Sequence, residues 1–155
     1  MNAVICPSPP RCEEPAALHM QSFAVRFEYP VVFTHQLFAP ANPVFADALR
    51  RREPGRRHRF VVFIDDQVVA AHPGLVHDIA AYAERWSQAM QLVAPPELVA
   101  GGEQAKNDPT LVARLQRRLL DLRIDRHAVV VGIGGGAVLD LIGYVAATTH
   151  RGVRH

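Results

Sequence analysis

Apolar residues gather in short runs along the chain, and the lengths of these runs predict strands. Residues 60–64 are continuously apolar, a pattern typical of a strand that is buried on both faces of a parallel sheet. Residues 128–131 and the weaker segment 91–94 are predicted as two further strands of that sheet. Near the N-terminus, residues 22–28 alternate in side-chain character, and an apolar segment, residues 31–34, follows Tyr29-Pro30; together they predict a short antiparallel strand pair.

Between the predicted strands, the apolar spacing changes to the three- and four-residue period of helices. One helix is predicted over about residues 74–90, where the apolar positions are Leu75, Ile79, Tyr82, Trp86 and Met90. Cap and proline signals predict others over about residues 43–52, after Asp108–Pro109 and from near Gly136. Strands alternating with helices predict an α/β fold, a Rossmann-like parallel sheet with helices on both faces, preceded by the antiparallel pair.

Residues 1–19 differ in composition from the rest of the chain. Four prolines stand there among small and charged residues, which predicts a disordered tail. Met20 stands at the beginning of the first patterned segment. The alternative to a disordered tail is therefore that translation begins at Met20 and that residues 1–19 are a mis-assigned start. Residues 20–155 are long enough for one domain with its own core, and we expect a single domain there.

Composition restricts the classes of partner. A formal net charge of +2 is too small to argue for a nucleic-acid or membrane partner, and neither is expected. No apolar run approaches the roughly 20 residues of a membrane span, and the N-terminus lacks a secretory pattern, so a cytoplasmic location is expected. Cys6 and Cys12 have no second cysteine pair, and neither a zinc knuckle nor a disulfide framework is predicted.

A glycine-rich segment, Gly132-Ile-Gly-Gly-Gly-Ala-Val-Leu-Asp140, follows the third predicted strand. Such a turn lets backbone N–H groups at a helix N-terminus approach a pyrophosphate, so it indicates a nucleotide cofactor. Gly132-x-Gly134-x-x-Ala137 also satisfies the dinucleotide fingerprint. The fingerprint normally stands at the first βα turn with an acidic residue about 20 positions later, and neither holds here. A tight turn without a ligand is the alternative.

A second polar segment, Gly102-Glu103-Gln-Ala-Lys106, lies about thirty residues upstream. Lys106 is the only lysine beside 16 arginines, and its compact ammonium can donate to ribose hydroxyls or a phosphate where a planar guanidinium would not fit. Glu103 could accept from a ribose diol. The alternative is a solvated loop.

Two further residues have both a ligand-binding and a structural interpretation. Asp65 ends the first parallel strand, where open α/β sheets bind ligands, but it could equally cap the next helix. Arg151 follows the last predicted helix, where a basic residue often only offsets the helix dipole. His72 and His77 are five residues apart and do not share a helical face, so no metal site is predicted.

In order, these motifs resemble the 3-dehydroquinate synthase family of sugar phosphate cyclases. The match comprises Asp65 with Val68, Gly102-Glu103-x-x-Lys106, Gly134-Gly-Gly-x-x-x-Asp140-Leu-x-Gly143, and Ala146-Ala147 leading into Arg151-Gly152-Val153-Arg154. In that family the first half is a Rossmann-like NAD-binding domain, which residues 20–155 would form. A helical second half holds a divalent metal, zinc or cobalt, and most of the substrate site.

The resemblance implies a role for each matching position. Asp65, Glu103 and Lys106 would contact the NAD ribose and neighbouring groups, with Gln67 and Gly102 beside them. The pyrophosphate side of NAD would be held by Gly135, Gly136, Ala137, Val138 and Asp140. Arg151 would bind the phosphate of the substrate, a keto-sugar phosphate.

The activity implied is a transient oxidation by NAD, elimination of phosphate, reduction of the ketone and an intramolecular aldol closure. Polyol and iron-containing alcohol dehydrogenases share the Gly-Gly-Gly-x-x-x-Asp loop, so an enzyme that carries out net oxidation of its substrate is one alternative. A non-catalytic NAD-binding module is the second alternative. Departures from the family pattern at Gln67, Leu139, Tyr144 and His150 bear on the substrate and subfamily.

The family's metal ligands would lie beyond His155. The chain is therefore expected to be an N-terminal fragment without cyclase activity of its own, with a homodimer as a possible assembly.

Overall fold

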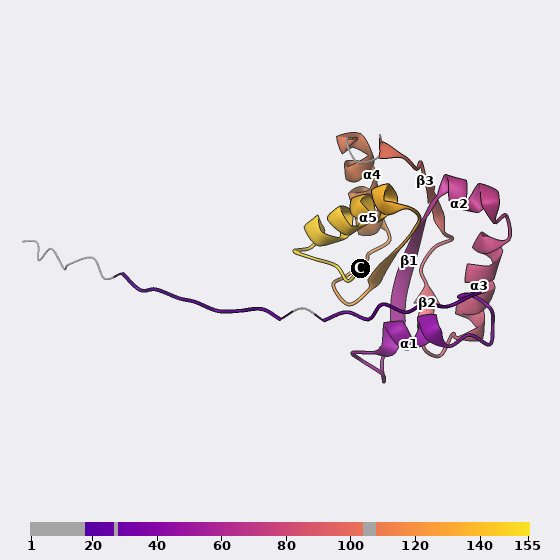
Figure 1. Ribbon diagram of the computed structural model, residues 1–155, viewed down its shortest axis with the longest axis horizontal. Helices are drawn as coiled ribbons and strands as arrows, with labels where there is room; N and C mark the ends of the chain where they lie inside the picture. Colours follow the sequence, from indigo (N-terminus) through magenta and orange to yellow (C-terminus); the bar gives the residue numbers. More distant parts are fainter. Residues whose placement is uncertain (1–17, 27, 104–107) are drawn as a thin grey trace, which may run out of the picture. The chain divides into compact units, whose positions relative to one another are not determined.

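In the computed structural model the chain divides into two compact units, Met1–Val31 and Val32–His155. The structure describes residues 18–26, 28–103 and 108–155. Within these residues every helix and strand lies in the second unit, and no helix is long and apolar enough to cross a membrane. Along the chain (Figure 1) the elements are α1 (Val44–Arg50), β1 (His58–Asp65), α2 (Asp66–Ala71), α3 (Leu75–Arg85), β2 (Met90–Leu92), β3 (Glu97–Val99), α4 (Pro109–Asp121), β4 (Val129–Ile133) and α5 (Gly136–Thr148).

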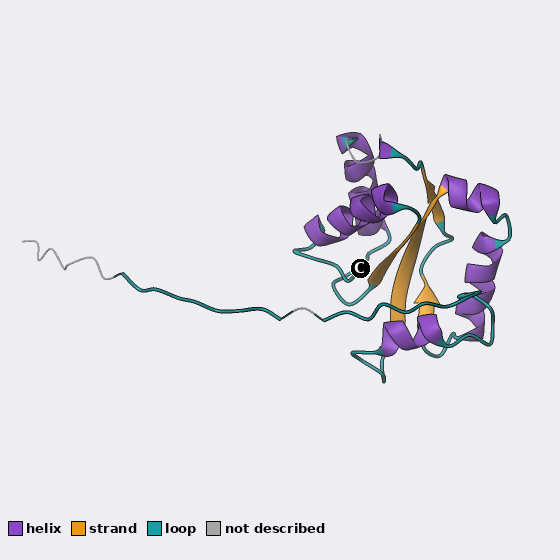
Figure 2. Ribbon diagram, viewed as in Figure 1, coloured by secondary structure: helices purple, strands orange, loops and turns teal. Residues whose placement is uncertain are grey.

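β1 is the centre of a parallel sheet, and the three other strands pair with it (Figure 2). β4 pairs with residues 60–64 of β1. β2 pairs with residues 58–60 of β1, and β3 pairs with residues 63–65 of β1. A strand has only two edges, so β2 and β3 share the edge that β4 leaves open. β2 lies beside the start of β1 and β3 beside its end.

Pro95 and Pro96 account for the break between β2 and β3. Phe60 pairs with Leu92 and Phe63 with Glu97, so two residues of β1 face four residues of the broken edge. Proline has no N–H to donate to a ladder, which makes it a residue of sheet edges and interruptions. The two short strands are therefore one edge of the sheet interrupted at this pair.

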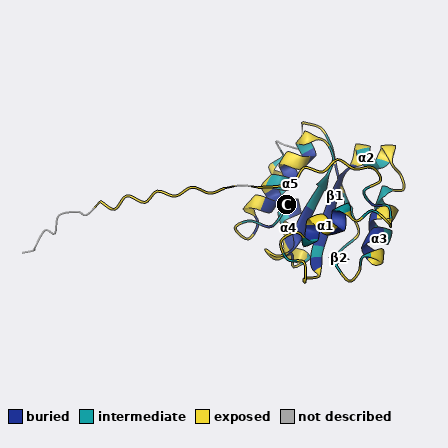
Figure 3. Ribbon diagram, turned by 60° about the horizontal axis from the view of Figure 1, so that its bottom comes forward, coloured by how far each residue is buried: buried dark blue, intermediate teal, exposed yellow. Residues whose placement is uncertain are grey.

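The apolar run of β1 is buried on both faces, as the sequence predicts. Alternate side chains point to opposite faces: Val61 and Phe63 pack with α4 and α5, whereas Phe60, Val62 and Ile64 pack with α1 and α3. Figures 1 and 3 show these helices on the two sides of the sheet, with their inward faces buried and their outward faces exposed. The parallel α/β fold with helices on both faces is confirmed.

The last residues of the chain extend the sheet at the outer edge of β4. Val129 and Arg154 form a parallel bridge, and the Val130 N–H donates to the Arg154 carbonyl at 2.8 Å. The Arg154 guanidinium lies 3.3 Å from the Glu53 carboxylate, in the turn before β1. The chain after α5 is therefore held in register with β4.

The predicted antiparallel pair is wrong. The described residues between 22 and 34 form no strand, and Phe23, Val25 and Phe33 are exposed. Alternation sets which side chains share a face, but a two-stranded ribbon gains stability only when that face is buried.

One helical boundary also differs from the prediction. The helix predicted to reach Met90 ends at Arg85, and Met90 begins β2. Met90 fits the helical spacing, but its buried side chain belongs to the sheet core. The short elements α2 and β3 were not predicted, because six and three residues are too few to show a period.

Candidate functional site

Three strand ends meet at one edge of the sheet. Since the strands are parallel, the residues that follow β1, β3 and β4 leave the sheet on the same side, which is where open α/β sheets bind ligands. Asp65 ends β1, Gly101 follows β3 and Gly134 follows β4. The structure thus brings together the three sequence segments that were predicted to hold a cofactor.

Asp65 lies at the centre of this junction. Its side chain is 8% exposed, and its Oδ1 accepts a hydrogen bond from the Gln67 N–H at 2.9 Å, which caps α2. A Cβ on Gly101 would lie 2.5 Å from the same oxygen, and one on Gly134 would lie 2.8 Å from the Asp65 Cβ. Only glycine allows the chain to pass this close on either side. The capping interpretation of Asp65 is confirmed, and its contact with a ribose stays a prediction.

Gly135 and Gly136 differ from these two glycines. A Cβ on either would meet no atom of the described residues within 4 Å. Neither position carries a positive φ, so the backbone there is open to any residue. No protein atom in the described part of the chain accounts for the two glycines, whereas the close approach of a ligand would.

The N-terminus of α5 presents free donors at this point. The helix begins without a side-chain cap at Gly135, and its first backbone bond joins the Leu139 N–H to the Gly135 carbonyl. The N–H groups of Gly136, Ala137 and Val138 precede that bond and have no intrahelical acceptor. With the positive end of the helix dipole they form an environment suited to an anion.

The other predicted cofactor residues fall into three groups. Gln67 and Asp140 are exposed, in the first turn of α2 and the second turn of α5, and Gly102 is exposed with a φ of 91° that favours glycine. Val138 is fully buried in the core, so only its backbone could bind a ligand. Glu103 is exposed beside the segment 104–107. Lys106 lies outside the described residues, so its role stays a prediction.

Asp108 resumes the described chain after this segment and starts α4. Its Oδ1 accepts hydrogen bonds from the backbone N–H groups of Thr110 at 2.8 Å and Leu111 at 3.2 Å. The Thr110 hydroxyl, followed by these N–H groups, holds the pKa of the Asp108 carboxyl below its ordinary value. This cap confirms the predicted start of the helix.

Arg151 does not join the junction. It is exposed beyond the C-terminal end of α5, whereas Gly135 and Gly136 stand at the N-terminal end. A helix of 13 residues separates them, which at 1.5 Å per residue is about 20 Å. A molecule that contacts both ends would have to span this length.

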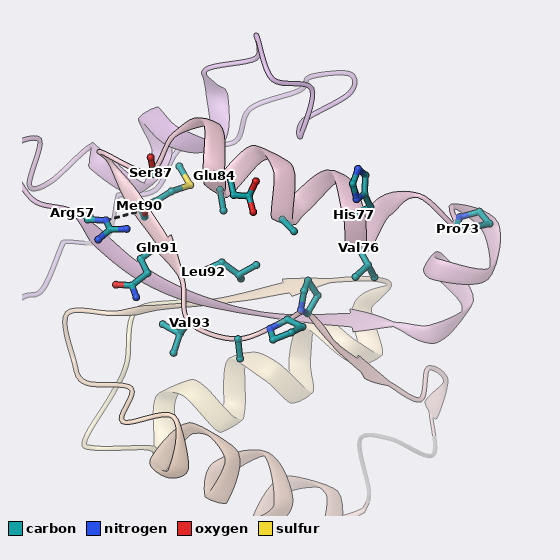
Figure 4. A pocket seen from close by; sticks show the side chains of 15 residues that line it. Arg57, Pro73, Val76, His77, Glu84, Ser87, Met90, Gln91, Leu92 and Val93 are labelled. Carbon is teal, nitrogen blue, oxygen red and sulfur yellow. Dashed lines mark hydrogen bonds between the residues drawn. The ribbon is translucent and has the colours of Figure 1, made fainter.

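Two features bear on other ligands. Among the described residues, no three His, Cys, Asp or Glu side chains lie close enough to hold a metal, so this part of the chain does not fit the family's metal. A groove of about 750 Å³ runs between α3 and the edge formed by β2 and the two prolines (Figure 4). None of the predicted cofactor residues that the structure describes lines it.

Sequence reasoning did not distinguish the roles of the glycines. Gly101 and Gly134 make room for Asp65, whereas Gly135 and Gly136 have open space. The pairs Gly101-Gly102 and Gly134-Gly135 are visible in the sequence, but only the meeting of β1, β3 and β4 shows which member of each pair is packed.

Comparisons with known proteins match this region to one family. Residues 96–155 match the family model described as 3-dehydroquinate synthase N-terminal. The chain is 45% identical over 56 residues to the 3-dehydroquinate synthase of Chlamydia muridarum, which is 36% of this chain and 15% of that protein. It is 33% identical over 126 residues to that of Ruegeria sp. (81% and 30%) and 28% identical over 129 residues to that of Streptococcus equi subsp. equi (83% and 31%). The chain spans less than a third of the length of these relatives.

Two solved structures of 2-deoxy-scyllo-inosose synthase are also similar. Their TM-scores are 0.48 and 0.49, at 22% and 24% sequence identity. Each covers 70% of this chain and 28% or 29% of the solved chain. One is a complex of that enzyme with carbaglucose-6-phosphate, NAD⁺ and Co²⁺.

Proposed function

We propose, from the relationship of this chain to the N-terminal part of the 3-dehydroquinate synthase family, that it is the NAD-binding part of a sugar phosphate cyclase. One observation carries the proposal. The carboxyl edge of the sheet joins Asp65, the loop after β3 and the uncapped start of α5, and the two glycines there face open space.

NAD fits this edge through the backbone. We expect its pyrophosphate to accept from the N–H groups of Gly136, Ala137 and Val138, with Gly135 and Gly136 allowing the phosphates to approach. The side chain of Val138 stays in the core and fixes the first turn of α5. Asp140, one turn further along α5, belongs to the same proposed contact region.

The adenosine side of NAD is assigned to the other two strand ends. Asp65 uses Oδ1 to cap α2, which leaves Oδ2 as the oxygen that would accept from a ribose hydroxyl. Gln67, Gly102 and Glu103 stand beside it on the loops after β1 and β3, and Lys106 completes the proposed set. When bound, NAD supplies reversible hydride acceptance, and these residues of the chain hold and orient it.

The cyclisation reaction needs chemical groups beyond those found in the described residues. Elimination of phosphate and closure of the sugar require a general base and a metal or other electrophile near the substrate, and the described residues hold no metal cluster. We therefore assign the chain the binding of NAD. The whole reaction belongs to a longer protein, with a keto-sugar phosphate as the substrate class.

Titration of the 155-residue chain with NAD⁺ by isothermal calorimetry tests the proposal. We expect one binding site per chain. Lys106→Ala should weaken binding by about 1.5–3 kcal/mol, the range for a hydrogen bond to a charged group, whereas Arg117→Ala on the exposed face of α4 should leave it unchanged. A chain that folds but binds no NAD⁺ would refute the proposal.

A second measurement separates the cyclase from a dehydrogenase. In a longer protein that contains this chain, a cyclase should release inorganic phosphate from a keto-sugar phosphate without accumulating NADH, because the oxidation is reversed in each turnover. A dehydrogenase of the polyol type would accumulate one NADH per substrate. Accumulation of NADH without phosphate would favour that alternative.

A further inference from the structure

A second site of distinct chemistry lies at the opposite end of the sheet from the glycine loop. α4 ends at Asp121, β4 begins at Val129 and α5 ends at Thr148, and the turns at these three points enclose a surface hollow of about 630 Å³. Five of its lining residues carry guanidinium or imidazole groups: Arg123, Arg126, His127, His150 and Arg151.

The hollow has an excess of positive charge. Three guanidinium groups line it beside one carboxylate, that of Asp125. Within the described part of the chain, Arg123, Arg126 and Arg151 have no ion pair, although Arg118 pairs with Glu97 and Arg154 with Glu53. Three arginines without an ion pair thus line one hollow.

The Asp125 carboxylate is already engaged in the turn. Its Oδ1 accepts from the N–H groups of His127 at 2.8 Å and Ala128 at 2.9 Å. Burial acts to raise the pKa of Asp125, but these hydrogen bonds outweigh it and the pKa lies below its ordinary value. The carboxylate therefore fixes the start of β4, and it offsets only one of the three guanidinium charges.

The backbone at the rim is held in a conformation that arginine rarely adopts. The Arg123 N–H donates to Leu120 and the Ile124 N–H to Leu119, each at 2.9 Å, which is the Schellman ending of a helix. Arg123 occupies its left-handed position, with a φ of 51°, where glycine is usual. His150 and Arg151 have φ values of 50° and 64° after α5. Each helix is thus followed within three residues by an arginine at a backbone position where a residue without a Cβ would be less strained.

The two turns lie side by side. The parallel bridge between Val129 and Arg154 aligns the chain after α5 with the chain entering β4. Three residues before this bridge stand Arg126 on one segment and Arg151 on the other. Both arginines line the same hollow.

We propose that this hollow binds a phosphate group, and that Arg126 and Arg123 hold it together with Arg151. Guanidinium groups bind phosphate oxygens in bidentate pairs, and His127 and His150 add ring N–H donors. The inference rests on the proposed function only where the phosphate is that of the substrate. The same chemistry would accept free inorganic phosphate.

The alternative is that the arginines only offset the dipoles of α4 and α5, whose C-terminal ends meet here. Arg59 already interacts with the C-terminal end of α4, since its guanidinium donates to the carbonyls of Leu122 and Arg123 at 3.1 and 2.8 Å. The two interpretations differ in what a substitution changes. Dipole compensation affects stability alone, whereas phosphate binding changes the affinity for an anion.

Titration of the 155-residue chain with inorganic phosphate tests the proposal, at constant ionic strength because exposed charges are screened by salt. Binding is followed by phosphorus NMR line width. We expect saturable binding that Arg126→Gln, Arg123→Gln and Arg151→Gln each weaken about tenfold or more, the usual cost of a charge-assisted bond. Arg117→Gln, on the exposed face of α4, is the matched control and should bind as the parent chain does.

A parallel titration with glucose 6-phosphate distinguishes the two sources of phosphate. Tighter binding than inorganic phosphate indicates a site that also contacts a sugar, and equal binding indicates free phosphate. The proposal is overturned if the parent chain does not bind phosphate, or if Arg126→Gln and Arg123→Gln bind it as tightly as the control does. NAD⁺ binding, measured on the same samples, depends on the glycine loop, so its loss would count against the proposed function and not against this site.

Discussion

Replacing Gly136 with alanine should raise the stability of the chain and lower its affinity for NAD⁺. Gly136 is the first residue of α5, and a Cβ there would meet no atom within 4 Å in the part of the chain that the structure describes. Alanine loses less backbone entropy than glycine on entering a helix, which is worth about 0.5–1 kcal/mol. In the absence of NAD⁺, the substitution should therefore increase the free energy of unfolding.

The effect on the cofactor has the opposite sign. If the pyrophosphate approaches the N–H groups at the start of α5, the added methyl group occupies part of that space and displaces at least one phosphate oxygen from its donor. A hydrogen bond to a charged group contributes about 1.5–3 kcal/mol. Losing it should therefore raise the dissociation constant for NAD⁺ roughly 10- to 150-fold. Few structural roles for a glycine would produce this pair of effects.

Two other glycines provide the controls. Gly134→Ala puts a Cβ 2.8 Å from the Asp65 Cβ and 3.2 Å from the Val138 Cβ, and overpacking of this kind costs about 1–3 kcal/mol. Gly55→Ala has open space like Gly136 but lies in the turn before β1, away from the loop. It should leave NAD⁺ affinity unchanged.

The assays are urea unfolding for stability and calorimetric titration for NAD⁺. A Gly136→Ala chain that is more stable and still binds NAD⁺ with parental affinity would refute the assignment of the pyrophosphate to this helix. It would leave the glycines as features of a tight turn.

Further predictions concern the core, the helix cap and the phosphate hollow. Tyr82→Phe removes a buried hydroxyl that donates to the Asn42 carbonyl at 2.6 Å and accepts from the Ala46 N–H at 3.3 Å; urea unfolding should show a loss of about 1–3 kcal/mol, and an unchanged unfolding free energy would contradict it. Because the pKa of Asp108 is lowered in the folded chain, the stability that its charge contributes is present above its unfolded pKa and is lost as pH falls below about 4. Asp108→Asn still caps α4 but does not titrate, so its melting temperature should fall less steeply in acid, and parallel curves would contradict this. In a longer, active protein, Arg151→Ala should lower kcat/KM by roughly 100-fold, by analogy with removal of one electrostatic stabiliser, with melting temperature unchanged; near-parental turnover would return Arg151 to a structural role.

The sequence predicts the long elements of this fold because each has enough residues to show a period. β1 is a run of apolar residues buried on both faces, and α4 starts at an Asp-Pro signal. β3 has three residues after two prolines, and its place is decided by pairing with the end of β1. Met90 follows Trp86 at helical spacing, yet it enters the sheet because α3 has already ended at Arg85.

The candidate site divides in the same way. Motif spacing predicts that Asp65 and the loops after β3 and β4 share one edge, since parallel strands end together. It does not predict that Asp65 caps α2, because that bond depends on the unpredicted helix. Nor does it show that Gly135 and Arg151 flank opposite ends of one unbroken helix, whose 13 residues span about 20 Å.

The pairing of three strands with β1 also constrains how the chain folds. Phe60 pairs with Leu92 and with Val129, so each ladder closes a long loop of chain before it gains its hydrogen bonds. Contacts so distant in sequence give a high contact order and slow folding. Since every ladder between the four strands includes β1, local fraying can open the edge strands one at a time but cannot release the centre. The amide protons of residues 60–64 should therefore exchange with solvent only when the whole unit unfolds, and their exchange rates would report its global stability.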